Sequence, residues 1–185
     1  MQRTASQTVG PFFLDALIHD GDEVIAKAGT AGRQIFVEGV VLDGEGNPVS
    51  DAFIEIAQAD AAGRLVADRV ELRAGAHFSG FGRASTDISG KFRFTTVYPG
   101  AIVMNRTSHA PHLNVMVFAR GLLKPLVTRI YFAGDAMNAV DPVLAVVPAH
   151  RRATLEAKTV PAGDVAVWRF DLRLQGKGET VFFDF

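Results

Sequence analysis

The chain has 185 residues, with 19 Lys and Arg against 20 Asp and Glu, no cysteine and two tyrosines. This length fits a single domain, and the lack of cysteine excludes thiol nucleophiles, disulfides, zinc ribbons and iron–sulfur clusters. The net charge of -1 argues against nucleic acid or an anionic membrane as the main partner. No apolar run is long enough for a membrane span, and the first residues lack the apolar core of a signal peptide. We therefore expect a cytoplasmic protein.

We expect residues 1–33 to form an arm rather than part of the main domain. A polar start leads into the short apolar stretch Pro11–Leu14, and Gly10 and Pro11 disfavour a long helix there. The arm is therefore expected to be extended, with irregular turns. Its apolar side chains need to be buried from solvent, so the arm should fold back over the domain or lie against a second chain.

Residues 34–185 show a pattern of short strands separated by turns. The alternation is clearest in Ala166–Leu174, where one face is apolar and the other charged, as in a strand with one buried face and one solvent-exposed face. The other expected strands are Gln34–Leu42, Ala52–Ala57, Lys91–Val97, His112–Ala119 and Leu126–Phe132. The best helix candidate is Pro148–Lys158, and Gly80–Arg83 is interpreted as a turn. This spacing predicts an all-β fold, an antiparallel β-sandwich.

The histidine spacing argues against a metal site built by this chain alone. A His-x-His pair on a strand would place both imidazoles on one face, but here the matching residues are His112 and Asn114. A neutral amide is a poor ligand for a transition metal. Motifs for a serine nucleophile, a phosphate-binding loop or a zinc protease are also absent from the sequence.

Two segments remain open to more than one interpretation. Arg120 ends an expected strand just before Gly121, and it is either a solvated charge or a guanidinium aimed at an anionic ligand. The segment Thr8–Pro11 either stabilises a turn or offers a hydroxyl and close backbone approach to a ligand. Spacing alone does not decide between these.

Several segments together resemble the intradiol ring-cleaving dioxygenases. They are Ser6–Phe13, Asp43–Glu55, Gln58–Gly63, Ala110–Asn114, Phe118–Gly121, Thr128–Phe132 and Leu174–Phe185. The resemblance covers nearly the whole chain, and the ending from Arg169 onward is its most specific part. It implies a β-sandwich of the intradiol dioxygenase type.

The resemblance also implies where the metal lies. In that family ferric iron is held by two tyrosines and two histidines, and some members pair homologous α and β chains of which only the β chain binds iron. This sequence is similar to the α type, because Asn114 replaces a histidine and Ala101–Val103 stands where a ligand tyrosine is expected. Tyr98 and Tyr131 are not at ligand positions. The resemblance thus implies Fe(3+) held by a partner β chain and none held here.

The activity implied is cleavage of 3,4-dihydroxybenzoate (protocatechuate) by O2 to 3-carboxy-cis,cis-muconate, a step of aromatic catabolism in the β-ketoadipate pathway. The resemblance places a shared active site at the α/β contact, with no catalytic residue from this chain alone. It assigns substrate binding to Thr8, Gly10 and Pro11 of the N-terminal loop and to Arg120. A preorganised arginine there would offset part of the negative charge of the substrate.

The sequence allows two other interpretations of the function. A self-sufficient, homo-oligomeric intradiol dioxygenase would need the His-x-His pair and the ligand tyrosine that this chain lacks. A non-enzymatic β-sandwich binding module would fit Asp43–Glu55 alone. The N-terminal Ser6–Phe13 loop and the C-terminal segment argue against the second alternative.

Overall fold

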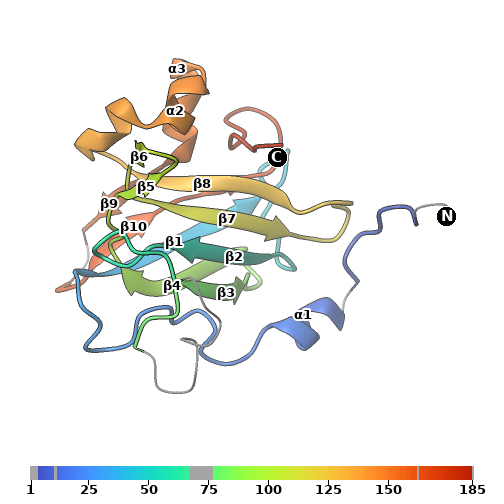
Figure 1. Cartoon of the computed structure of the whole chain (residues 1–185). Helices are drawn as coiled ribbons and strands as arrows, with labels where there is room; N and C mark the ends of the chain where they lie inside the picture. The colour runs from blue at the N-terminus through green and yellow to red at the C-terminus, as the bar shows by residue number, and fades with distance from the viewer. Residues whose placement is uncertain (1–3, 11, 67–76, 162, 185) are drawn as a thin grey trace.

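The computed structural model describes residues 4–10, 12–66, 77–161 and 163–184 (Figure 1). Its strands are β1 (Gln34–Leu42), β2 (Phe53–Gln58), β3 (Phe81–Ser85), β4 (Lys91–Val97), β5 (Ile102–Met104), β6 (Thr107–His109), β7 (His112–Phe118), β8 (Leu126–Phe132), β9 (Glu156–Val160), β10 (Ala166–Arg169) and β11 (Leu172–Arg173). Its helices are α1 (Phe12–Leu17), η1 (Ala136–Val140), α2 (Pro142–Val146), α3 (Ala149–Arg152) and η2 (Ala153–Leu155). None of these helices has the length and hydropathy needed to cross a membrane.

Nine of the described strands form a continuous hydrogen-bonded path that curls around one core, and β5 and β6 pair separately as a two-stranded sheet. One half runs β4–β1–β10–β9, with β11 also on β1, and the other half runs β8–β7–β2–β3. The predicted all-β sandwich is confirmed, but not every strand pair is antiparallel. The pairs β1–β10, β1–β11 and β8–β9 are parallel. Parallel neighbours need long connections, so short-range turn signals in the sequence could not reveal them.

Side chains from both halves meet in one apolar cluster. Val37, Phe94 and Trp168 come from the first half, and Ile54 and Val115 come from the second. Each such large side chain contributes about 1.5–3 kcal/mol when it is removed from water. This cluster fixes the two halves relative to each other and so supports the ends of the strands, where loops meet.

Aspartates hold two of the turns that the sequence predicts. Asp43 Oδ1 accepts hydrogen bonds from the amides of Glu45 and Asn47, and Asp87 Oδ1 accepts from those of Ser89 and Lys91. These bonds, led by those from Asn47 and Lys91, lower the pKa of the two exposed carboxyl groups. Local side-chain bonds of this kind favour turns over regular structure.

The segment Ala166–Leu174 has the two faces that its alternation predicts, but it is not one strand. Trp168 and Phe170 are buried while Arg169 and Asp171 are exposed. The ladder is interrupted because Asp171 Oδ1, rather than a backbone carbonyl, accepts the hydrogen bond from the Val40 amide at 3.1 Å. The segment therefore divides into β10 and β11.

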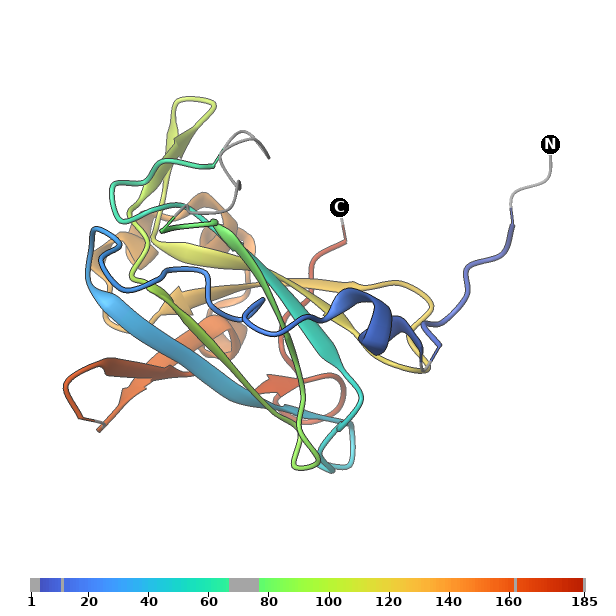
Figure 2. The same ribbon diagram turned by 90° about the horizontal axis from the view of Figure 1, so that it is seen from below.

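The N-terminal segment differs from the extended arm that we expected. It contains the short helix α1, and residues 4–10 lead away from the strands (Figures 1 and 2). Farther along, Ile25 and Ala26 lie in the core, and the Ile25 amide donates to Thr95 O at 2.8 Å. The division of the chain at residue 34 stays a prediction.

Two other local predictions from the sequence differ from the structure. Most of Gly80–Arg83, interpreted as a turn, instead belongs to β3 (Phe81–Ser85), which pairs with β2. The helix expected over Pro148–Lys158 ends at Leu155, because Glu156 and Ala157 pair with β8. Tertiary strand pairing overrides local propensity in both places.

Candidate active site

The N-terminal loop and the turn after β7 meet at one place on the surface. Thr8 Oγ1 accepts a hydrogen bond from the Gly121 amide at 2.7 Å, across 113 positions of sequence. Arg120 lies beside this contact and pairs through its Nε with the Asp51 carboxylate. The structure thus brings Thr8 and Arg120, two of the predicted substrate-binding residues, into neighbouring positions.

An aromatic cluster positions this meeting point. The rings of Phe53 on β2 and Phe118 on β7 stack with centroids 4.4 Å apart, and Phe13 of α1 lies 5.3 Å from Phe53. Aromatic pairs of this kind contribute about 0.5–1.5 kcal/mol beyond their burial. They attach α1, and the loop before it, to the strands that lead to Asp51 and Arg120.

The other two residues of the loop that were predicted to bind substrate are Gly10 and Pro11. Gly10 is exposed, and a Cβ atom built at its position would meet no atom of the other described residues within 4 Å, its chain neighbours aside. Its carbonyl accepts from the Phe13 amide at 3.1 Å, so it starts the turn into α1. Pro11 lies outside the described residues.

A small pocket of about 210 Å³ opens beside this loop. Gln7 and Val9 of the loop line one side, and Leu122 and Lys124 of the β7–β8 connection line the other. The pocket therefore combines apolar walls with a cationic side chain. Such a lining suits a small anion with an apolar body.

A larger pocket of about 810 Å³ lies against β1, β3 and β4. Of the predicted residues that the structure describes, Thr8, Gly10 and Arg120 line neither this pocket nor the smaller one. Two arginines of the larger pocket already have carboxylate partners. Arg83 lies 2.6 Å from Glu55, and Arg93 lies 3.6 Å from Glu38. Because these two arginines are already paired with carboxylates, they are less available to bind an anionic ligand. We therefore do not take this pocket as the candidate site, although it is the larger of the two.

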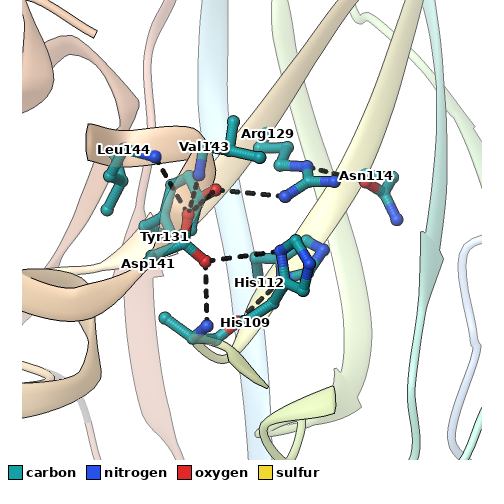
Figure 3. Close-up of polar contacts among 9 residues, drawn as sticks. His109, His112, Asn114, Arg129, Tyr131, Asp141, Val143 and Leu144 are labelled. Carbon is teal, nitrogen blue, oxygen red and sulfur yellow. Dashed lines mark hydrogen bonds and ion pairs between the residues drawn. The ribbon is translucent and has the colours of Figure 1, made fainter. Parts of the chain in front are cut away.

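A second polar cluster, shown in Figure 3, lies inside the protein around Asp141. The Asp141 carboxylate is buried and accepts hydrogen bonds from the amides of Ala110, Val143 and Leu144 and from the Tyr131 hydroxyl. These bonds lower the pKa of Asp141 even though burial acts to raise it. The carboxylate caps the start of α2 and joins it to β8.

This cluster includes His112 and Asn114, the residues that match the metal-binding His-x-His pair of the family that the sequence resembles. The imidazole of His112 is buried, with Nδ1 2.7 Å from Ala110 O, while Asn114 Oδ1 accepts from Arg129 Nε at 3.1 Å. A guanidinium beside the Asn114 amide repels a cation. Among the described residues, no group of three or more His, Cys, Asp or Glu side chains could hold a metal ion. The donor set present does not fit ferric iron.

The two tyrosines are arranged as hydrogen-bond donors on opposite sides of β8. Tyr131 donates to Asp141 at 3.0 Å, and Tyr98 donates to Asp135 at 2.8 Å. Tyr98 packs on Phe132, 4.4 Å between centroids, and Phe132 points to the other face of the strand from its neighbour Tyr131. Burial raises the pKa of both phenols. The two hydroxyls therefore cannot converge on one ligand.

The sequence and the fold both match those of known proteins. A family model described as "Dioxygenase" matches residues 8–176. The chain belongs to this dioxygenase family. It is 44% identical to the protocatechuate 3,4-dioxygenase alpha chain of Burkholderia cepacia, over 100% of this chain and 98% of the relative. The beta chain of the same enzyme from that organism is 34% identical, over 90% of this chain and 75% of the relative.

Solved structures agree in fold with this dioxygenase family. Catechol 1,2-dioxygenase from Acinetobacter sp. ADP1 superposes with a TM-score of 0.66 at 20% identity, covering 88% of this chain and 60% of that one. The resemblance to intradiol ring-cleaving dioxygenases found in the sequence is confirmed. The roles of Thr8, Gly10, Pro11 and Arg120 stay proposals.

Sequence reasoning missed three residues of this dioxygenase-family chain. Asp51 stands inside the Asp43–Glu55 motif but carries no local signal for its contact with Arg120. Asp141 precedes Pro142, and an Asp before Pro is a recognisable helix start. Arg129 sits on a strand, and only the pairing of β7 with β8 places it beside Asn114.

The Thr8 contact leads to a prediction about the N-terminal loop of this dioxygenase-family chain. Thr8→Val keeps the shape of the side chain but removes its acceptor, so the Gly121 amide should lose protection. We expect its hydrogen exchange to quicken by about fivefold to tenfold, the equivalent of one hydrogen bond. Thr8→Ser keeps the acceptor and serves as the control. Equal exchange rates in all three proteins would contradict the contact.

Proposed function

We propose that this chain is the α subunit of a protocatechuate 3,4-dioxygenase and works in a complex with a homologous β chain. The observation that carries the proposal is the contact between the Thr8 loop and the turn at Arg120, in a chain whose described residues include no donor set for iron. The full-length likeness to a named alpha chain supports the same assignment. We place the protein in the cytoplasm, as expected from its sequence.

In this proposal the chain positions and encloses the substrate. Arg120 pairs with the carboxylate of 3,4-dihydroxybenzoate through charge-assisted hydrogen bonds, which are stronger than neutral ones. The loop of Thr8, Gly10 and Pro11 forms part of the pocket wall and keeps water away from the ring. Holding the substrate in one orientation lowers the entropy cost of the reaction.

The oxidative chemistry in this proposal belongs to the β chain, which carries the ferric iron. The reaction breaks the bond between the two hydroxyl-bearing carbons, each of which takes one atom of O2 to become a carboxyl carbon, and gives 3-carboxy-cis,cis-muconate. That product retains the carboxylate that Arg120 holds. No residue of this chain forms or breaks a bond.

Arg120→Ala in the assembled enzyme tests the role of this arginine. We expect the ratio kcat/KM for protocatechuate to fall by about tenfold to a hundredfold, the range for losing hydrogen bonds to a charged group. Arg169→Ala removes another half-exposed arginine, which is paired with Asp171 at 3.2 Å, and should leave the ratio unchanged. Unchanged kcat and KM in the Arg120 variant would overturn the proposed role.

A further inference from the structure

We propose that Asp51 is a positioning residue that orients Arg120 toward the substrate carboxylate. This inference rests on the proposed function, in which Arg120 binds that carboxylate. Asp51 itself does not touch the substrate. It acts through the guanidinium, and the contact between the two side chains is the observation from which the inference starts.

The contact uses the side of the guanidinium and leaves its end available. Asp51 Oδ2 accepts from Arg120 Nε, whereas the two terminal nitrogens of Arg120 make no hydrogen bond to the described residues. A guanidinium has five N–H groups in a rigid planar fork. With Nε occupied, the remaining N–H groups can pair with both oxygens of one carboxylate.

Asp51 is itself held in place by the start of β2. The next residue is Ala52, and its carbonyl accepts hydrogen bonds from the Thr86 hydroxyl at 3.1 Å and from the Thr86 amide at 2.9 Å. The Ala52 amide in turn donates to Thr86 Oγ1. The Asp51 side chain is 26% exposed, against 67% for Arg120. The more buried carboxylate therefore restrains the more exposed guanidinium.

The backbone of Arg120 is restrained from a different direction. The neighbouring Gly121 amide is bound by Thr8 Oγ1, and Gly121 has a φ of 89°, which favours glycine. The N-terminal loop thus holds the turn while β2 holds the side chain. An arginine restrained at both ends loses less conformational freedom when it binds a ligand.

A second effect of Asp51 has the opposite sign. Its negative charge would repel the substrate carboxylate, which lies on the far side of the guanidinium. Solvent weakens this repulsion because Arg120 is largely exposed and stands between the two anions. The orienting hydrogen bond acts at direct contact, so we take it as the larger effect.

The test uses the assembled α/β enzyme and two substrates, protocatechuate and catechol, which lacks the carboxylate. Asp51→Ala should raise KM for protocatechuate by about fivefold to tenfold, with kcat changed less than about twofold and catechol turnover unaffected. Asp51→Asn still offers an oxygen to Arg120 Nε and should restore most of the loss. Glu38→Ala removes the carboxylate partner of Arg93 on another strand pair, β1 and β4, and should leave KM and kcat unchanged for both substrates.

The outcomes separate the two proposals. If Arg120→Ala impairs protocatechuate turnover while Asp51→Ala leaves its KM unchanged or lowers it, Asp51 does not position the arginine and only this inference fails. Equal losses for protocatechuate and catechol in Asp51→Ala would show a structural defect and would also overturn it. If Arg120→Ala itself has no effect, the proposed function of Arg120 fails first.

Discussion

Replacing Asp141 by alanine should lower the free energy of unfolding by about 3–5 kcal/mol. The variant leaves three backbone amides and the Tyr131 hydroxyl without their acceptor, and buried donors that lose a partner are costly. Two of the three amides, those of Val143 and Leu144, form the cap of α2, so the start of this helix is weakened as part of the same loss. Together these losses amount to a large part of the stability of an ordinary domain.

Urea denaturation at one fixed protein concentration measures this effect, because association with a partner shifts apparent stability. Asp164→Ala removes an exposed carboxylate and should change the free energy of unfolding by less than about 0.5 kcal/mol. An Asp141 variant as stable as the Asp164 control would contradict the network in Figure 3.

Acid should destabilise the protein through His112 before it acts on the carboxylates. Burial lowers the pKa of His112 from 6.5 to about 4, with a smaller contribution from the Arg129 charge. A depressed pKa in the folded state means that unfolding takes up a proton between these two values. Stability is therefore full above pH 6.5 and is lost progressively down to about pH 4, by about 3 kcal/mol in total.

The variant His112→Asn isolates this contribution. Asparagine keeps a donor near the Nδ1 position, which faces Ala110 O, but it does not titrate. The free energy of unfolding should then depend much less on pH between 6.5 and 4, while His150→Asn, at an exposed site on α3, should behave as the parent. Asp141, whose pKa is also lowered, loses its contribution only at more acid pH. Identical pH curves for the parent and the His112 variant would contradict the account.

Much of the fold could be predicted because its strands obey local rules. The alternation around Trp168 and the aspartate turns at Asp43 and Asp87 depend on residues a few positions apart. By contrast, β9 follows directly on a helix, and its place beside β8 depends on a long-range parallel pairing. The short helix α1 also depends on long-range contacts, because Phe13 packs on rings from two strands that are distant in the sequence.

The candidate site could be predicted only in part, and for a physical reason. The resemblance supplied Thr8 and Arg120, but no pattern links Arg120 to Asp51, 69 positions away. The Arg129–Asn114 contact likewise follows from strand register rather than from either residue alone. Polar networks are closed by tertiary structure, so sequence identifies their members more readily than their partners.

The most direct test of the account compares this chain alone with the chain assembled with a β chain. Each preparation is assayed for bound iron and for protocatechuate-dependent oxygen uptake. We predict iron and activity in the α/β complex and neither in this chain alone, because the side chains around His112 and Asn114 do not provide a donor set for the metal. Iron bound in stoichiometric amount by this chain alone would contradict the account.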